Sequence, residues 1–250
     1  MYEVLSLTSR SWIAGLAAAG LVSALAATSV DAASVGVRIA FGTETLTFLD
    51  NDSSQNDRNP DPDTIDFNLG ASPGGAAFSA LGFTTLEIDG AKCTVCPFTL
   101  TMDLEASNPG SQIPLEVLVS GIDFTQPPPT QVAWIGQFLF SGIMPGGTVT
   151  TEAFWDPGNQ FFAMTNPVGS FFHDGINGIP PYSGLQNSTG PGWTSPYSQT
   201  LRMVFTFEAQ TSTLQSQSQM QVAPIPLPAS LPLLMGGIGL LGFLRARRKR

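Results

Sequence analysis

The stretch "TLTMDLEA", Thr99–Ala106, indicates how most of this chain folds. In it Leu100, Met102 and Leu104 alternate with polar residues. Successive side chains of an extended strand point to opposite faces, so the three apolar side chains share one face and Thr101 and its polar neighbours share the other. The stretch is therefore predicted to be a β-strand with one apolar and one polar face.

Nine more segments of the 250-residue chain have β-branched, aromatic or alternating apolar residues between turn-forming ones. With 26 Gly and 20 Pro residues, long helices are disfavoured, because both residues destabilise a helix interior. No helix is expected between the two hydrophobic ends of the chain. About ten short strands predict an all-β fold, an antiparallel β-sandwich. Together with the segment that contains Thr99–Ala106, the ten segments are residues 34–41, 44–50, 64–70, 83–89, 98–106, 114–124, 132–143, 148–156, 160–165 and 200–210.

The middle of the chain is strongly acidic. Between Ala33 and Ala223 there are four basic residues against seventeen acidic ones, a net charge of −13. Such a body repels phosphate backbones, so nucleic acid is excluded as a partner. Divalent cations and solubility are the themes that this charge favours.

Residues 1–32 have the pattern of a secretory signal peptide with its helix. A basic residue precedes the uncharged stretch "SWIAGLAAAGLVSALAATSV", and small residues follow it. Val30 and Ala32 fit the positions before a cleavage site, and Ala24 and Ala26 offer a second choice. The alternative is a buried N-terminal helix. The signal-peptide interpretation predicts export.

At the other end, Ala229 to Leu244 carry no charge. Sixteen residues of helix span about 24 Å, a little short of a ~30 Å hydrocarbon core, so a single transmembrane helix is predicted. A basic cluster follows it and supplies a positive-inside stop signal, which places the C-terminus in the cytoplasm. The cluster consists of Arg245, Arg247, Arg248, Lys249 and Arg250.

Immediately before this span stands "IPLPAS", in which Pro226, Leu227, Pro228 and Ala229 form a short proline motif. Motif, span and basic cluster, in this order, resemble the C-terminal signal of PEP-CTERM proteins, the bacterial exosortase substrates, in its VPLPA-CTERM variant. The resemblance implies that an exosortase-type membrane transpeptidase cuts near the motif, after transient anchoring in the inner membrane. The body then goes to the cell surface or the extracellular matrix. The alternative is a single-span membrane protein that is never cut.

Between the body and this signal lies a segment rich in Ser, Thr and Gln. Its composition is typical of a flexible linker, so residues 208–223 are predicted to be a stalk. The predicted organisation is a signal peptide (1–32), a β-sandwich body (33–207), the stalk and a sorting signal (224–250). Within the body, residues 180–196 are turn-rich and predicted to be a long surface loop.

The chain holds two cysteines, Cys93 and Cys96, in the pattern C-x-x-C. A zinc site needs four ligands, and the one histidine, His173, is distant in sequence. A redox motif normally opens a helix, whereas strand-like sequence follows here. In an exported chain a local disulfide is the favoured interpretation.

The stretch "DNDSSQNDRNPDPD", residues 50–63, is the strongest candidate for a metal site in the body. Calcium takes six to eight oxygen ligands and tolerates irregular loops, so a Ca²⁺ site is one interpretation. The other is a solvated acidic loop, because the stretch departs from the EF-hand pattern. The candidate ligands are Asp50, Asp52, Asp57, Asp61 and Asp63.

No catalytic constellation is evident. Asp174 adjoins His173, but neighbouring residues on an extended chain point apart, and no G-x-S-x-G motif is present. Aromatic clusters are expected to pack in the core. We therefore predict an exported, non-catalytic structural or adhesive protein without a cofactor other than Ca²⁺. The alternative is a secreted carbohydrate-binding or carbohydrate-active protein, whose partner is an extracellular polysaccharide; glycosidase carboxylates have no local signature.

Overall fold

In the computed structural model, the described residues form twelve strands and one short helix, all within the compact unit that begins at Ala33. Among them no helix is long and apolar enough to cross a membrane. The predicted signal peptide, transmembrane helix and sorting motif lie outside the described residues. The structure describes residues 34–51, 56–93, 98–108, 112–125, 134–175, 181–188, 196–208 and 212–224.

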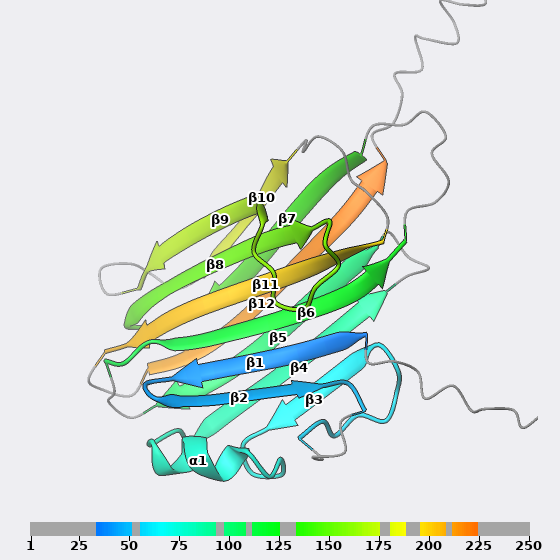
Figure 1. The fold of residues 1–250 in the computed structure, drawn as a ribbon. Coiled ribbons are helices and arrows are strands. Elements are labelled where there is room, and N and C mark those ends of the chain that lie inside the picture. The colour runs from blue at the N-terminus through cyan, green and yellow to red at the C-terminus, as the bar shows by residue number, and fades with distance from the viewer. Residues whose placement is uncertain are drawn as a thin grey trace, which may run out of the picture. The chain divides into compact units, whose positions relative to one another are not determined.

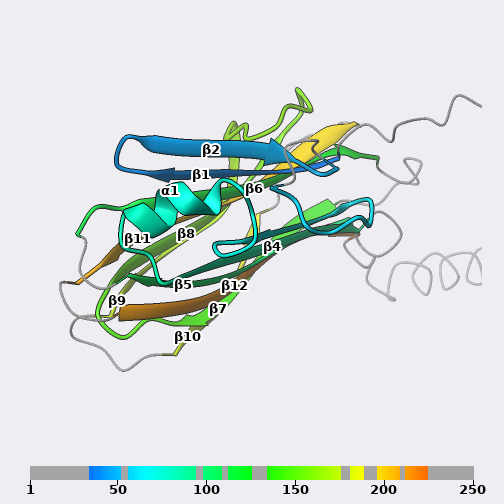
Figure 2. The same cartoon turned by 90° about the horizontal axis from the view of Figure 1, so that it is seen from below.

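The strands form two six-stranded sheets, and every neighbouring pair is antiparallel. Sheet A has the order β2 (Glu44–Leu49), β1 (Val35–Phe41), β6 (Leu115–Phe124), β11 (Tyr197–Phe207), β8 (Gly147–Asp156) and β9 (Asn166–Asp174). Sheet B has the order β10 (Tyr182–Ser188), β7 (Trp134–Ile143), β12 (Ser212–Pro224), β5 (Thr99–Asn108), β4 (Thr85–Cys93) and β3 (Thr64–Asn68). Figure 1 and Figure 2 show the two sheets as face-to-face layers. The predicted antiparallel β-sandwich is therefore confirmed.

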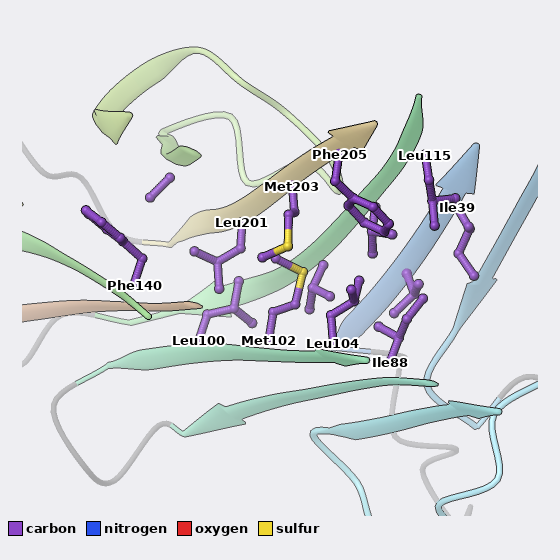
Figure 3. Close-up of a cluster of buried hydrophobic side chains, with 14 of the residues drawn as sticks. Ile39, Ile88, Leu100, Met102, Leu104, Leu115, Phe140, Leu201, Met203 and Phe205 are labelled. Atoms are coloured by element: carbon purple, nitrogen blue, oxygen red, sulfur yellow. The ribbon is translucent and has the colours of Figure 1, made fainter. Parts of the chain in front are cut away.

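The core lies between the two sheets. It consists of apolar side chains that alternate along the strands with outward-pointing polar ones, as in β5. Burying each of its large apolar side chains contributes about 1.5–3 kcal/mol. A helix that the sequence did not predict, α1 (Gly75–Ala80), lies beside β2 and β3 and adds the buried ring of Phe78 at that edge (Figure 2). Figure 3 shows two triplets of buried side chains meeting between the layers: Leu100, Met102 and Leu104 of β5, and Leu201, Met203 and Phe205 of β11.

Nine of the ten predicted strand segments contain a strand, and residues 160–165 do not. This segment belongs to the loop between β8 and β9, which lies across β11 and β6 in Figure 1. Asn159 and Phe162 have φ of 52° and 59°, which an extended strand cannot accommodate. The backbone N–H of Phe162 donates to Ser120 Oγ (3.0 Å), and the guanidinium of Arg38 lies 5.2 Å from the Phe162 ring centroid. The aromatic residues that suggested a strand therefore cover the outer face of sheet A.

The predicted stalk is wrong for residues 212–223, which belong to β12 (Ser212–Pro224) in the centre of sheet B, between β5 and β7. Leu214, Met220 and Val222 are buried, whereas the intervening glutamines point outward. Two inward positions are serines, and Ser218 Oγ lies 2.9 Å from Thr151 Oγ1 of the opposite sheet. Hydrogen bonding thus replaces apolar contact at these positions. The body extends to residue 224 rather than 207.

The predicted long loop over residues 180–196 is also partly wrong, because β10 (Tyr182–Ser188) pairs with β7 at the edge of sheet B. The side chain of Gln186 extends from β10 to β9 of sheet A. Its Nε2 donates to Ser170 O (2.7 Å), and its Oε1 accepts from Ser170 N (2.8 Å). This amide pairs with the backbone as a strand would and connects the edges of the two sheets.

The position of β12 predicts the effect of a proline within it. Gln219 lies opposite Thr101 of β5 and Leu139 of β7, so Gln219→Pro removes a backbone donor inside a central strand. We expect a loss of at least about 3 kcal/mol in the free energy of unfolding, measured by urea denaturation. Gln219→Ala, the matched control, keeps the backbone and should cost less than about 1 kcal/mol. Equal stability of both variants would mean that this segment is a stalk after all.

Candidate functional site

The outer face of sheet B carries polar side chains in rows that run across the strands. The strand register places one residue from each strand in such a row, and the side chains of a row are near neighbours. The central row, from β3 to β10, consists of Asp66, Asp89, Asp103, Gln217, Ser141 and Ser183. The adjacent row consists of Asn68, Glu87, Glu105, Gln215 and Ile143.

Apart from Asp66 and Asn68 of β3, the residues of these two rows line a groove of about 600 Å³ on this face. Carboxylates of β4 and β5 form one side of it, and hydroxyl and amide side chains of β12, β7 and β10 form the other. A second hollow of about 450 Å³ adjoins it, shares Ser141, Ser183 and Gln217, and adds Leu139 and Leu185. The face thus changes from acidic on β4 and β5 to partly apolar on β7 and β10.

The carboxylates of this face repel one another. Asp89 lies opposite both Asp66 and Asp103, and like charges placed directly opposite destabilise a sheet. Partial burial, the largest cause, and the charges of Asp66, Glu87 and Asp103 together raise the pKa of Asp89 to about 6, against the effect of Arg58. Burial also raises the pKa of Asp66, against the effect of Arg58, whose Nη1 lies 3.7 Å from Asp66 Oδ2.

On the outer face of sheet A, by contrast, two carboxylates form salt bridges with an arginine. There Arg202 donates from Nε to Glu116 (2.6 Å) and from Nη1 to Glu152 (2.5 Å). Among the described residues, no salt bridge joins a cation to Glu87, Asp89, Asp103 or Glu105. The groove therefore keeps negative charge that the fold itself does not neutralise.

The floor of the groove includes the phenol edge of Tyr182. Its hydroxyl donates to Ser216 Oγ (2.8 Å), and burial raises its pKa to about 12, so it stays a neutral hydrogen-bonding group. A Cβ at Gly142 would lie 2.4 Å from this hydroxyl, so a side chain there would displace it. Serine hydroxyls, glutamine amides and carboxylates together offer donors and acceptors to a ligand with many hydroxyl groups.

Most aromatic side chains pack in the core, as the sequence predicted. Trp155 is buried, and Phe171 packs against the core and stacks on Phe140 with ring centroids 4.2 Å apart. Phe161 and Phe162 instead cover the outer face of sheet A, and Phe172 on β9 has 61% of its surface exposed. Among the described residues that line the groove, only Tyr182 is aromatic.

The aspartates of the predicted calcium loop bind their own backbone. Asp50 is buried and accepts from the backbone N–H of Asp63 (2.9 Å). Burial, as the largest cause, and the charges of Asp57 and Asp63 together raise the pKa of Asp50 to about 6, against the effect of the Asp63 N–H. Asp57 accepts from three backbone N–H groups, those of Asn51 (3.1 Å), Asn59 (3.0 Å) and Asp66 (3.1 Å).

Within the described ranges, no group of three or more His, Cys, Asp or Glu side chains is arranged to hold a metal ion. Asp63 accepts from Ser34 Oγ and lies 3.7 Å from Lys92 Nζ, and Asp61 is exposed. Asp52 lies outside the described residues. Calcium binding by this loop stays a prediction, and what the structure assigns to Asp50 and Asp57 is the folding of the loop.

Of the remaining residues that the sequence analysis singled out, the structure describes Cys93, His173 and Asp174. Cys93 forms a disulfide at the end of β4, and Cys96, the second cysteine of the sequence, lies outside the described residues. The ring of His173 lies 4.9 Å from that of Tyr182, whereas Asp174 is exposed. The proline motif and the basic cluster at residues 226–250 lie outside the described residues.

The sequence did not predict the groove. Asp103 and Glu105 were recognisable as the polar face of a strand, but their neighbours on the other strands of the groove come from positions 14 to 114 residues away. One signal was present: Gln215, Gln217 and the next two alternate glutamines repeat with the period of a strand. The low hydrophobicity of the intervening serines concealed it.

Comparisons with known proteins assign the chain to no family. No family model and no curated protein matches the chain. Among solved structures, TmCBM61 in complex with β-1,4-galactotriose matches with 7% identity and a TM-score of 0.32, over 59% of this chain and 94% of that one. The N-terminal cellulose-binding domain of Cellulomonas fimi β-1,4-glucanase C matches with 13% identity and a TM-score of 0.29, over 59% and 91%.

A tailspike protein of bacteriophage CBA120, in its enzymatically active domain, matches with 10% identity and a TM-score of 0.29. The match covers 55% of this chain and only 18% of the tailspike structure. TM-scores this low leave the ligand of the present chain to be argued from its own residues.

The acidic loop yields a stability prediction. Asp57→Ala removes the acceptor of three backbone N–H groups, so we expect a loss of about 1–2 kcal/mol in the free energy of unfolding. Asp61→Ala, at an exposed carboxylate of the same loop, is the control and should stay within about 0.5 kcal/mol. Urea denaturation measures both. A neutral Asp57→Ala would show that the loop does not depend on this carboxylate.

The carboxylate row yields a pH prediction. The folded state keeps the Asp89 proton up to about pH 6, above the ordinary value of 3.8, so its stabilisation is present at low pH and is lost as the pH rises through 6. Asp89→Asn should raise the urea midpoint at about pH 8 and leave it almost unchanged near pH 4. Glu44→Gln, on the other sheet, controls for the loss of one carboxylate. A midpoint of Asp89→Asn below the wild-type value at high pH would contradict this.

Proposed function

We propose that the protein is an exported, non-catalytic carbohydrate-binding protein, with the groove on the outer face of sheet B as its binding site. The observation that carries this proposal is the groove of about 600 Å³ with serine, glutamine and carboxylate side chains on the outer face of sheet B. Its carboxylates accept hydrogen bonds, and its amides and hydroxyls both donate and accept, so the groove can pair with the hydroxyl groups of a glycan.

The extent of the face favours a chain of sugars over a single one. The row from Asp89 to Ser183 crosses five strands, which are about 4.8 Å apart, so it is roughly 19 Å long. The adjoining hollow widens this surface along the strands by one more row, that of Gln219, Leu139 and Leu185. An extracellular polysaccharide fits such a surface better than a small metabolite, which needs an enclosed pocket.

Delivery to the outside is the second part of the proposal. The signal-peptide pattern of residues 1–32 and the VPLPA-like motif with its basic cluster support export, transient anchoring in the inner membrane and cutting by an exosortase-type transpeptidase. A body that binds polysaccharide is consistent with the surface or matrix destination that this route implies. A purely structural, adhesive role shares the route and differs in having no glycan ligand.

Binding is tested by affinity electrophoresis of the protein in gels that contain single soluble polysaccharides, both neutral and amino-sugar types. We expect retention in at least one of them. Gln217→Ala should weaken that retention at least about fivefold, and Ser183→Phe, which places a ring in the groove, should abolish it. Thr150→Ala, on the outer face of sheet A, is the matched control and should be retained as the wild type is. Absence of retention in every gel favours the purely structural role.

Sorting is tested by the mass of the exported protein from its native host. We expect a mature form that begins after the signal peptide and ends near Pro226–Ala229, without the basic cluster. Replacing Pro226 and Pro228 by Ala should leave the precursor uncut in the membrane fraction, because the stiff extended motif is lost. A mature protein that still carries Arg250 would contradict exosortase-type processing and would leave a plain membrane anchor.

A further inference from the structure

The geometry points to a glycan that carries free, protonated amino groups as the ligand of the sheet B groove, in preference to a neutral glycan. This inference rests on the proposed carbohydrate-binding function and names the chemical class of the sugar. It concerns the acidic half of the groove, formed by Glu87 and Asp89 of β4 and by Asp103 and Glu105 of β5.

The first step of the argument is charge. The register places Asp89 opposite Asp103 and Glu87 opposite Glu105, which makes a square of four carboxylates on two adjacent strands. Such pairs cost stability, and among the described residues no cation forms a salt bridge with any of the four; Arg58, which pairs with Asp66, only lowers the pKa of Asp89 from a distance. A ligand with ammonium groups supplies the missing counter-charge, and its binding is strengthened by the repulsion that it removes.

The second step is the spacing of these groups. Side chains opposite one another on antiparallel strands have Cβ atoms about 4.5–5.5 Å apart, so the four carboxylates do not converge on one point. No arrangement for a metal ion is found among the described residues, in agreement with this spread. Several separate cationic groups along a chain match four spread carboxylates, which a single compact cation does not.

The third step is what surrounds the charge. Beside Asp103 and Glu105, the neighbouring strand presents the amides of Gln217 and Gln215, and Ser141 follows on β7. A ligand held at the carboxylates thus meets amides and hydroxyls within one or two strand spacings, about 5–10 Å. Amino sugars carry ammonium and hydroxyl groups on the same ring. A basic peptide would use the carboxylates and leave the amide and hydroxyl half of the groove with fewer partners.

Calorimetry of the full chain with two matched probes tests this. The probes are the β-1,4-linked pentamer of glucosamine and the same pentamer of N-acetylglucosamine, at about pH 6 and low salt. We expect the amino pentamer to bind at least about tenfold more tightly. The double variant Asp103→Asn, Glu105→Gln should bring the two affinities within about twofold. Glu44→Gln on β2 is the control and should keep the tenfold preference.

The outcomes separate this inference from the proposed function. Equal affinity of the wild type for both pentamers overturns the amino-sugar preference and leaves carbohydrate binding standing. Absence of binding to both pentamers, and to every polysaccharide in the gels, overturns both. Pentalysine that binds more tightly than the amino pentamer, with loss in the double variant, overturns the inference in favour of a basic peptide. Urea denaturation of the double variant verifies folding; a midpoint at or above that of the wild type is expected, because like charges are removed.

Discussion

The contact between β5 and β11 is the constraint on which the rest of the structure depends. Leu100, Met102 and Leu104 face Leu201 and its neighbours across the core, and this fixes which side of β5 points outward (Figure 3). A shift of one residue would exchange the two faces of the strand. The same packing that forms the core therefore places Asp103 and Glu105 in the groove, so site and core are two faces of one strand.

The sequence predicted those parts of the fold in which alternation is apolar against polar, as in β5, β6 and β11. It failed at β12, because Ser216 and Ser218 occupy inward positions where apolar residues are expected. This strand is held by ladders to β5 and β7 and by the Thr151–Ser218 hydrogen bond, none of which is encoded in local hydrophobicity. It also failed at residues 160–165, because aromatic residues that cover a sheet from outside have the same composition as those inside a strand.

The groove was harder to predict from the sequence than the fold. Polar faces of single strands can be read from alternation, but which strands become neighbours depends on the order β10, β7, β12, β5, β4 and β3, which alternation does not contain. The acidic loop shows the opposite error. Its composition suggested a metal site, whereas both carboxylate oxygens of Asp57 accept hydrogen bonds from backbone N–H groups. Asp and Asn side chains fold loops as readily as they bind ions.

The place of β12 in the chain has a consequence for how the protein matures. This strand is the last of the twelve in sequence and stands in the middle of sheet B. Before residues 212–224 are available, β5 and β7 lack the strand that pairs with both of them, so the backbone groups that bond to β12 have no partner there. Completion of the sandwich is thus timed by the arrival of its C-terminal strand, immediately ahead of the proline motif. A chain that ends before β12 would expose the unpaired edges of β5 and β7, which can pair with strands of other chains.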